Sequence, residues 1–302
     1  MSNKLDISVV IINYNTSEVL KECLTNLFSL KDGLNMEVIV VDNASPDDSV
    51  QMVKSNFAQV KLIEQTQNKG LAYASNVGLR EAKSDYIAYL GSDAFPKDNT
   101  LSQILSYMHQ HKDVGAVTPK LVLRDGSLDM DAHRAFPTPL VSFFKFSGLS
   151  TIFKNSTYFN KYFLAGADLN SPHEIDLCIA HFMVIKRSVL EQLHGWDEDY
   201  FLYGEDVDMC FRIKKAGYKI VYMGNLEAVH YKGVTVGVRA SSANISKASK
   251  ETRLRSRKNS VDAMEIFYKK HFTHYPKPIT WTILTSVKIL GFLRILKEQL
   301  TS

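Results

Sequence analysis

The stretch that decides the fold is Ile7-Ser8-Val9-Val10-Ile11-Ile12-Asn13-Tyr14, a nearly continuous run of β-branched residues. A run of this kind, without polar alternation, is typical of a strand buried on both faces, as strands of parallel sheets are. Residues 16–30 then repeat apolar side chains at the i, i+3, i+4 spacing of an amphipathic helix. A second apolar strand follows at 36–42. The chain is therefore predicted to begin with a β-α-β unit.

The same alternation continues along the chain. Further strand-like runs lie near residues 60–63, 85–90, 114–117, 178–185 and 218–223, and helix-like segments near 48–57, 71–83, 98–111 and 187–193. This order predicts an α/β fold with a mostly parallel sheet flanked by helices. Residues 124–172 are irregular and rich in aromatics, which we interpret as a loop-and-hairpin excursion over the site. Ligands of such sheets bind at the carboxyl ends of the strands.

Charge is distributed unevenly over the 302 residues. The net charge is +4, yet residues 239–302 carry thirteen Lys/Arg against four Asp/Glu, so the rest of the chain is acidic. We expect residues 239–260 to be mobile without ligand and residues 279–297 to form an amphipathic helix. That helix could lie in a membrane interface, or pack on the domain or on a second copy in a homodimer. The basic segment lacks interleaved aromatics, so nucleic acid is not expected as a partner.

Cysteine usage and the N-terminus favour a cytoplasmic protein. Cys23, Cys178 and Cys210 are too scattered for a disulfide framework or a thiolate metal site, which fits a reducing compartment. Residues 1–6 lack the pattern of a secretory signal. No uncharged apolar run reaches the roughly 18–20 residues that a spanning helix needs.

Residues 195–208 pack six carboxylates among four aromatics and lead into a segment that ends at Gly217. The pattern predicts a helix closed by this glycine, with Glu205 and Asp206 in its first turn. Exposed N–H groups and the helix dipole favour negative charge there. A carboxylate held beside apolar walls can act as a general base. The alternative is an acidic cap on a surface helix.

Three polar residues at predicted strand ends have the chemistry of a ligand site. Asp42 could accept hydrogen bonds from a nucleoside, although an aspartate here can also start a turn and cap the next helix. Asp93 suits a hard divalent cation, or else a turn before Pro96. His230 could complete a metal site or serve as a structural hydrogen bonder. The chain contains no Gly-x-Gly-x-x-Gly after its first strand and no phosphate-binding Walker loop.

An ordered set of motifs carries a resemblance to a known family. The set consists of Val9-Val10-Ile11-Ile12-Asn13-Tyr14-Asn15, Val40-Val41-Asp42-Asn43-Ala44-Ser45, Asn68-Lys69-Gly70, Asn76-Val77-Gly78, Asp93, Gly195-Trp196-Asp197-Glu198, Tyr203-Gly204-Glu205-Asp206-Val207-Asp208 and His230. In this order and spacing it resembles the family 2 glycosyltransferases with the GT-A fold, over about residues 7–235. The closest similarity is to the bacterial rhamnosyltransferase-like branch, which builds O-antigen, capsule or cell-wall polysaccharide.

The resemblance implies roles for the matched positions. Asp206 would be the general base, with Glu205 beside it shaping acceptor contacts. Asp93 and His230 would hold Mg²⁺ or Mn²⁺. The implied donor-binding residues are Asn13, Asn15, Asp42, Asn43, Asn76 and Ser92, of which Asn76 would line the diphosphate region. The chain departs from the family at Gly91-Ser92-Asp93, where the first acid of the Asp-x-Asp element is missing.

The expected activity is inverting sugar transfer from a nucleotide-diphosphate donor, first dTDP-rhamnose and next a UDP-hexose. The acceptor would be a hydroxyl of a glycan or lipid-linked glycan. Residues 1–238 would form the catalytic domain, with its donor part at about 1–120 and its acceptor part at about 121–238. Residues 239–302 would form a tail at the cytoplasmic face of the plasma membrane.

Two other functions stay open from the sequence. A nucleotidyltransferase-like enzyme would also use an α/β sheet and acidic metal sites, but it would normally carry a Gly-rich basic loop after the first strand. Asn13-Tyr14-Asn15-Thr16-Ser17-Glu18 stands there instead. A non-catalytic, membrane-associated scaffold with a degenerate site is the other alternative, because the first metal acid is missing.

Overall fold

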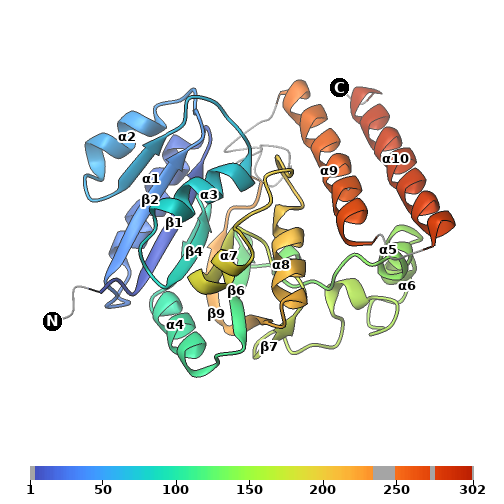
Figure 1. Cartoon of the computed structure of the whole chain (residues 1–302), viewed down its shortest axis with the longest axis horizontal. Helices are drawn as coiled ribbons and strands as arrows, with labels where there is room; N and C mark the ends of the chain where they lie inside the picture. Colours follow the sequence, from blue (N-terminus) through green and yellow to red (C-terminus); the bar gives the residue numbers. More distant parts are fainter. Residues whose placement is uncertain (1–3, 234–248, 273–275, 301–302) are drawn as a thin grey trace.

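A computed structural model describes residues 4–233, 249–272 and 276–300. Its centre is a nine-stranded sheet with the order β3-β2-β1-β4-β8-β6-β9-β5, in which β7 also pairs with β9 (Figure 1). The strands are β1 (Ile7–Asn13), β2 (Met36–Asp42), β3 (Lys61–Glu64), β4 (Tyr86–Gly91), β5 (Ala94–Pro96), β6 (Val114–Leu123), β7 (Pro172–Ile175), β8 (Phe182–Lys186) and β9 (Lys219–His230). The helices are α1 (Ser17–Ser29), α2 (Ser49–Asn56), α3 (Leu71–Glu81), α4 (Thr100–Gln110), α5 (Pro139–Phe146), α6 (Leu149–Ile152), α7 (Arg187–Gln192), α8 (Glu205–Lys215), α9 (Lys250–His271) and α10 (Lys277–Leu300), with short 3-10 helices η1 (Met130–Ala132) and η2 (Lys161–Phe163).

The N-terminal half of the sheet is parallel, as the apolar runs predict. Strand β1 pairs in parallel with β2 and with β4, and β2 pairs in parallel with β3. The β1–β2 register sets Asn13 opposite Asp42, so both side chains leave the sheet at the same edge. Parallel register thus brings together two polar residues that are 29 positions apart in the sequence.

The C-terminal half makes the sheet mixed rather than mostly parallel. Strand β8 is antiparallel to both β4 and β6, while β6 and β9 are parallel. Strands β5 and β7 both add to β9 in antiparallel pairing. The direction of β8 depends on how the chain returns after the irregular excursion, and a local apolar run carries no information about that. The predicted α/β fold, a sheet flanked by helices, is confirmed, with this difference in strand direction.

Helices cover both faces of the sheet and complete two apolar cores. On one face, alternate β1 side chains such as Val9 pack with α1 and α4. On the other face, Val10 packs with α3, α7 and α8. Helix α3 approaches β1 so closely that a Cβ on Gly78 would lie 2.3 Å from Val10 Cγ1. A larger residue at Gly78 would therefore push α3, and the site residues that follow it, away from the sheet.

The excursion over residues 124–172 is helical where a hairpin was expected. It contains η1, α5, α6 and η2, and Figure 1 shows α5 and α6 beside the ends of α9 and α10. Thr138 caps α5 by accepting from the backbone N–H of Val141, and Pro139 occupies the first turn. Strand β8 begins at Phe182, four residues later than predicted, because residues 178 and 179 are irregular and residues 180 and 181 form a turn.

The basic C-terminal region is helical as far as it is described. The predicted mobile segment 239–260 is wrong for residues 250–260, which belong to α9, while residues 234–248 lie outside the described residues. The predicted domain boundary at 238–239 falls in that same undescribed segment. Ser249 caps α9 by accepting from the N–H of Thr252, so the helix has a defined start.

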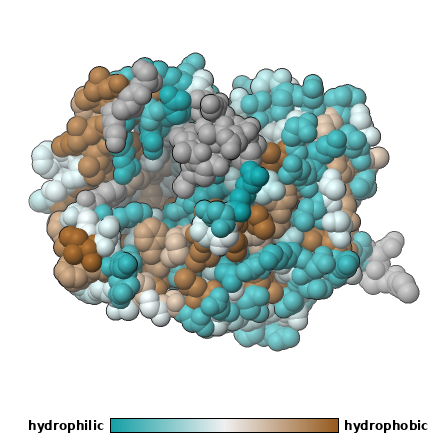
Figure 2. All heavy atoms as spheres, turned by 180° about the vertical axis from the view of Figure 1, so that it is seen from behind, coloured by the Kyte–Doolittle hydropathy of each residue, from teal (hydrophilic) through white to brown (hydrophobic). Residues whose placement is uncertain are grey.

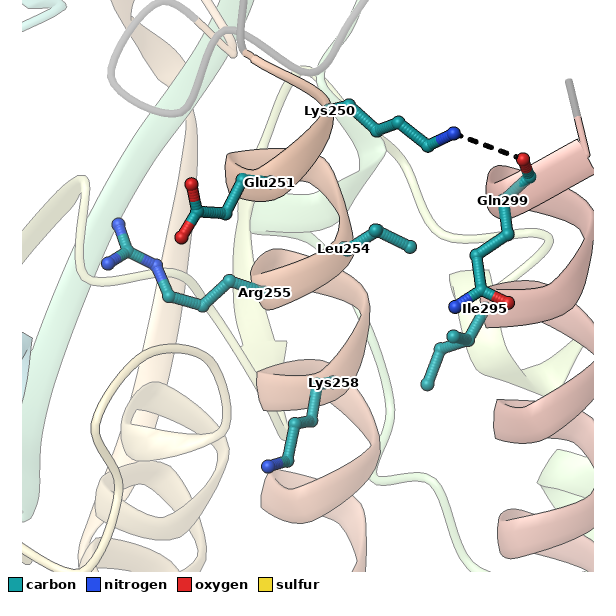
Figure 3. A pocket seen from close by; sticks show the side chains of 7 residues that line it. All are labelled: Lys250, Glu251, Leu254, Arg255, Lys258, Ile295 and Gln299. Carbon is teal, nitrogen blue, oxygen red and sulfur yellow. Dashed lines mark hydrogen bonds between the residues drawn. The ribbon is translucent and has the colours of Figure 1, made fainter. Parts of the chain in front are cut away.

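Helix α10 packs alongside α9. A Cβ on Gly291 would lie 2.5 Å from Val261 Cγ2, so the two helices approach closely at this glycine. An open pocket of about 570 Å³ lies between the same helices. Figure 3 shows the side chains that line it, among them Lys250, whose Nζ donates to the carbonyl of Gln299 at 3.2 Å.

By length and composition, α10 is also a candidate membrane span. An 18-residue window of this helix has a mean hydropathy of 1.5, and only 11% of that window is buried. Lys288 and Arg294 interrupt the apolar run, which agrees with the absence of a long uncharged stretch in the sequence. The expected amphipathic helix at 279–297 is confirmed as a helix that extends over 277–300.

Candidate functional site

A cavity of about 960 Å³ at the strand ends is lined by four of the predicted site residues, Ser92, Glu205, Asp206 and His230. Its lining does not include the other predicted site residues, which are Asn13, Asn15, Asp42, Asn43, Asn76 and Asp93. Its lining includes Ser92 after β4, His181 before β8, His230 at the end of β9, and Asp206 in the first turn of α8. Helix α9 adds a wall that includes Tyr268. Segments that are separated by more than 150 residues in the sequence therefore share one cavity.

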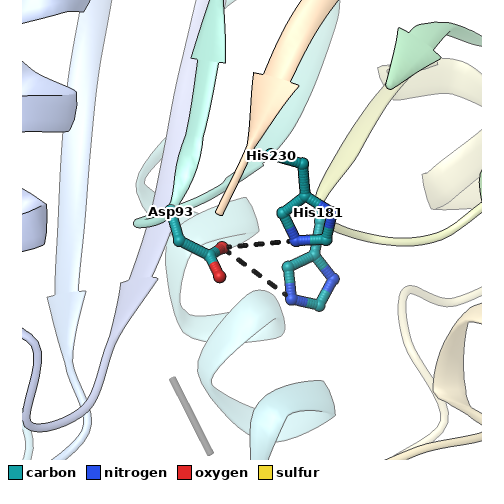
Figure 4. Close-up of side chains that lie close together, drawn as sticks. All are labelled: Asp93, His181 and His230. Carbon is teal, nitrogen blue, oxygen red and sulfur yellow. Dashed lines mark ion pairs between the residues drawn. The ribbon is translucent and has the colours of Figure 1, made fainter. Parts of the chain in front are cut away.

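A candidate metal site lies in the described residues at the edge of this cavity. Ligand atoms of Asp93, His181 and His230 lie within 4.8 Å of one another, and Figure 4 shows both imidazoles directed toward the carboxylate. The distance from Asp93 Oδ1 to His230 Nε2 is 3.7 Å, and to His181 Nε2 it is 4.0 Å. The pairing of β5 with β9 sets Ala94 opposite His230, which brings Asp93 to the histidine.

The residues present fit a divalent cation. Asp93 is fully buried, yet neither of its carboxylate oxygens has a hydrogen-bond partner, and His230 Nε2 also has none. Buried polar atoms without partners are costly unless something binds them. His230 Nδ1 lies 2.8 Å from Asp129 Oδ2, a carboxylate–histidine contact that orients the other ring nitrogen toward a metal.

Protonation states also suit a cation. Burial lowers the pKa of His181 more than Asp93 raises it, so this imidazole is neutral at neutral pH, as a ligand must be. Burial raises the pKa of Asp129, but hydrogen bonds from His230 and Lys232 lower that pKa by a larger amount. The net pKa therefore lies below its usual range, which keeps Asp129 ionised.

The sequence reasoning missed His181. The strand predicted over residues 178–185 would place the His181 side chain among buried apolar side chains, away from the site. The available signal was that His181 is the only ionisable residue of that run apart from Cys178. His181 instead lies in a turn at residues 180 and 181, where its side chain reaches Asp93.

The predicted nucleoside residues form one hydrogen-bonded cluster. Asn13 Nδ2 donates to Asp42 Oδ1 at 2.8 Å, and Ser45 Oγ donates to the same oxygen at 2.6 Å. Thr16 Oγ1 donates to Asn13 Oδ1 at 2.7 Å and lies 3.0 Å from Ser92 Oγ. Since Ser92 lines the cavity, this chain of contacts connects Asp42 to the metal-site turn. Asp42 is only 2% exposed, so its carboxylate is held inside this cluster.

Asn15 and Asn43 flank this cluster with different exposures. Asn15 is exposed in a left-handed backbone conformation, and its N–H donates to Ser45 Oγ at 2.9 Å. Asn43 is buried, and its Nδ2 donates to Asn68 Oδ1 at 2.9 Å. Asn43 therefore holds the loop at 68–70, while the exposed side chain of Asn15 is open to a ligand.

The structure gives Asn76 a role different from the predicted diphosphate contact. Its Nδ2 donates to the Trp196 carbonyl at 2.9 Å and to Glu198 Oε1 at 2.8 Å, and its Oδ1 accepts from Trp196 N–H at 2.8 Å. Every polar atom of the side chain is thus used within the fold. Asn76 fastens the segment that leads to α8, and its neighbour Ser75 lines the cavity instead.

Glu205 and Asp206 occupy the first turn of α8, as predicted. Gly217 follows the helix with φ +89 and bonds back to Lys214, which completes the predicted C-terminal closure. Burial, reinforced by the charge of Asp206, raises the pKa of Glu205 to about 8. Glu205 Oε2 is buried without a hydrogen-bond partner. Burial also raises the pKa of Asp206, although Arg134 opposes this shift.

The third acid of the motif has a structural function. Asp208 is fully buried and accepts from Arg212 Nε and from His271 Nε2, both at 2.6 Å. Arg212 also donates to the carbonyls of Leu193 and Gly195 at 2.9 and 3.0 Å. Asp208 therefore ties α8 to α9 and to the turn before the motif, while Asp206 faces the cavity.

Comparisons with known proteins identify the family of the chain. The profile of the glycosyl transferase family 2 matches residues 8–194. Rhamnosyltransferase WbbL of Escherichia coli is 25% identical over 232 residues, which cover 74% of this chain and 82% of that protein. The N-acetylglucosaminyl-diphospho-decaprenol L-rhamnosyltransferase of Mycobacterium tuberculosis is 23% identical over 298 residues, covering 95% and 92%.

Solved structures share the fold. Mannosyltransferase PcManGT from Pyrobaculum calidifontis, in complex with GDP-Man and Mn²⁺, superposes with a TM-score of 0.58 at 19% identity, covering 98% of this chain and 72% of that one. S. aureus TarS 1-349 with UDP-GlcNAc has a TM-score of 0.55 at 16% identity, covering 93% and 71%. The family profile spans more than half of the chain, so this protein belongs to glycosyl transferase family 2.

Proposed function

We propose that this glycosyltransferase is a metal-assisted, inverting enzyme that uses a nucleotide-diphosphate sugar. The first-choice donor is dTDP-rhamnose, because two similar proteins are named rhamnosyltransferases, and UDP-hexoses come next. The acceptor is a hydroxyl of a glycan or lipid-linked glycan in bacterial surface polysaccharide. The enzyme works at the cytoplasmic face of the plasma membrane.

One observation carries the proposal: an Asp-His-His cluster, in which the buried ligand atoms of Asp93 and His230 have no hydrogen-bond partner, borders the same cavity as a pair of carboxyls. Asp93, His181 and His230 supply the cluster, and Glu205 and Asp206 supply the carboxyls. A sugar nucleotide requires both features, a cation for its diphosphate and a base for the acceptor hydroxyl. The cavity volume of about 960 Å³ suits a ligand of that size.

Asp93, His181 and His230 would hold the cation, which supplies Lewis-acid neutralisation of the diphosphate charge when bound. Two imidazole donors favour Mn²⁺ over Mg²⁺, because Mg²⁺ prefers oxygen ligands while nitrogen ligands suit transition metals. PcManGT was solved with Mn²⁺, which supports the same choice. The Asp129–His230 contact keeps the second ring nitrogen of His230 available.

Asp206 performs the proton transfer. Its carboxylate accepts the proton of the acceptor hydroxyl while that oxygen attacks the anomeric carbon from the face opposite the diphosphate. The bond between the anomeric carbon and the diphosphate oxygen breaks, and nucleoside diphosphate leaves with that electron pair. A single displacement inverts the configuration. One base is sufficient because the leaving group needs no proton, in contrast to the two carboxylates of glycosidases.

Membrane location is supported by the exposed surface at the C-terminal end. Figure 2 shows hydrophobic areas on the side where α10 and α5–α6 lie. The exposed large apolar side chains there are Leu140, Phe143, Ile152, Phe153, Tyr158, Ile279, Trp281, Ile289, Phe292, Leu293, Leu296 and Leu300. Basic residues such as Lys288 alternate with this apolar face, an arrangement that suits an anionic leaflet. A lipid-linked acceptor would be presented at the same surface.

Transfer is tested with purified full-length protein, Mn²⁺ and a panel of dTDP- and UDP-sugars, with synthetic lipid-linked acceptors. Product mass and anomeric configuration are read by mass spectrometry and NMR. We expect an inverted glycoside and released nucleoside diphosphate. Donor binding without transfer to any acceptor would instead favour the scaffold, and retention of configuration would contradict the single displacement.

Membrane binding is tested by flotation with anionic and neutral vesicles. We expect wild-type protein to float with anionic vesicles, and a Trp281→Ser/Phe292→Ser variant to float much less. Ser286→Ala, on the exposed part of the same helix, is the matched control. Equal flotation of all three proteins would overturn the membrane assignment. A dimer in solution whose interface buries Trp281 and Phe292 would overturn it as well.

A further inference from the structure

Arg134 is a buried cation beside the proposed base. Its guanidinium Nη2 lies 3.8 Å from Asp206 Oδ2, and the side chain is only 13% exposed. It also lines the cavity, although it stands in the irregular excursion and belongs to none of the motifs that identified the family. An opposite charge this close to a carboxyl favours its ionised form.

The fold holds Arg134 in place from two directions. Its backbone exchanges hydrogen bonds with Leu177, at 3.1 and 3.0 Å, which attaches the excursion to the segment before β8. Its Nη1 donates to Tyr162 Oη at 3.1 Å. Lys145 Nζ lies 3.5 Å from the centre of the Tyr162 ring. The guanidinium is therefore fixed by the excursion and directed toward α8.

Asp206 is surrounded by groups of both signs. Glu205 precedes it on α8, Asp131 and Arg134 approach from the excursion, and the Cys178 thiol lies near it before β8. Among these groups Arg134 is the cation, and it contacts Asp206. Glu205 is buried and its Oε2 has no hydrogen-bond partner, which favours a proton on this carboxyl. The Arg134 guanidinium instead lies beside Asp206 and favours the ionised form of that carboxyl.

We propose that Arg134 is a positioning residue that keeps Asp206 ionised as the base and leaves the proton of the carboxyl pair on Glu205. The inference rests on the proposed function and assigns to the excursion a part in the chemistry. Burial and the Asp206 charge raise the pKa of Glu205 to about 8, consistent with this division. The protonated Glu205 adds no second negative charge to the place where the acceptor proton is accepted.

The test is the pH dependence of kcat/KM for wild type, Arg134→Gln and Arg134→Lys, with Mn²⁺ saturating at each pH. Activity falls at low pH as Asp206 takes a proton. The midpoint of this fall in kcat/KM, called the acidic limb, reports the pKa of Asp206. Loss of the neighbouring cation in Arg134→Gln should move the acidic limb to higher pH by about one to three units. Arg134→Lys keeps the charge, so its limb should stay near that of wild type even if its maximal rate falls. Tyr162→Phe is the matched control, because it removes the hydrogen bond and keeps the cation.

A second variant keeps the inference testable if Arg134→Gln does not fold. Asp131 raises the pKa of Asp206, so Asp131→Asn should move the acidic limb downward. A role of Arg134 in folding alone would lower the rate at every pH without moving the limb, and that result would overturn the inference. An inactive wild-type enzyme would count against the proposed function, whereas an active wild type with unchanged limbs in both variants would count against Arg134 alone.

Discussion

Replacing Asp206 by asparagine removes the proposed base and leaves its surroundings nearly unchanged. Asp206 Oδ1 accepts the N–H of Val207 at 2.8 Å, and an amide oxygen can accept the same bond. Oδ2 lies 3.8 Å from Arg134 Nη2, and an asparagine side-chain nitrogen fits in the position of Oδ2 at that separation. The variant therefore keeps the shape of the cavity and loses the proton acceptor.

The size of the expected effect follows from that single loss. A positioned general base contributes about 10²–10⁴ in rate. This range corresponds to about 3–5 kcal/mol of transition-state free energy, because each tenfold change in rate is about 1.4 kcal/mol. Donor binding should be nearly intact, since the predicted donor residues Asn13 and Asp42 lie at another edge of the site.

The assay is product formation under saturating donor and Mn²⁺, with a thermal-shift measurement of donor binding on the same preparation. A ligand at about 100 times its dissociation constant should stabilise the fold by about 2.7 kcal/mol. Asp199→Asn is the matched control, because Asp199 is an exposed acid that pairs with Lys270 outside the cavity. The control should turn over at about the wild-type rate. Turnover by Asp206→Asn within about threefold of that rate would refute the assignment of the base.

Three further results are expected. The pKa of Glu205 is raised from 4.5 to about 8 in the folded protein, so its contribution to stability is present below about pH 4.5 and is lost as the pH rises through about 8. Urea unfolding should therefore show that Glu205→Gln gains at least about 1 kcal/mol of unfolding free energy relative to wild type between about pH 5 and pH 8. Parallel plots of unfolding free energy against pH for the two proteins would contradict this expectation. Asp129→Asn should weaken Mn²⁺ binding by about 10–100-fold because it no longer orients His230, measured by electron paramagnetic resonance, and unchanged affinity would exclude that role. Arg212→Leu should cost about 3–5 kcal/mol of unfolding free energy because it leaves Asp208 buried with one partner fewer, whereas a cost below about 1 kcal/mol would mean that His271 alone compensates the charge.

The elements of the fold that depend on local patterns were predictable. The apolar runs of β1 and β2 identify buried strands, and the spacing of apolar residues identifies α1. Glycine at 217 marks the end of α8. The direction of β8 and the helical structure of α9 were not predictable, because both depend on contacts with residues distant in sequence. Residues 250–260 look like a charged linker, and become helical where they cover the cavity.

The candidate site shows the same division. Asp93, His230 and Asp206 stand at ends of regular elements, where a pattern can locate them. His181 and Arg134 lie in irregular segments and acquire their positions from hydrogen bonds to residues distant in sequence, His181 to Gly91 and Arg134 to Leu177. Asn76 shows the reverse error, because a conspicuous polar residue proved to hold the fold together. A motif identifies residue types, but the partners of each polar atom decide whether that residue is free for a ligand.

The most direct test of the account is a Mn²⁺ titration followed by electron paramagnetic resonance, with and without dTDP or UDP, on wild type, Asp93→Asn and His181→Ala. We expect stoichiometric Mn²⁺ binding that tightens with the nucleotide and is lost in both variants. His173→Ala is the matched control, because His173 pairs with His133 away from the metal cluster. Wild-type affinity in Asp93→Asn and His181→Ala would contradict the claim that these distant residues together hold the cation for an activated sugar.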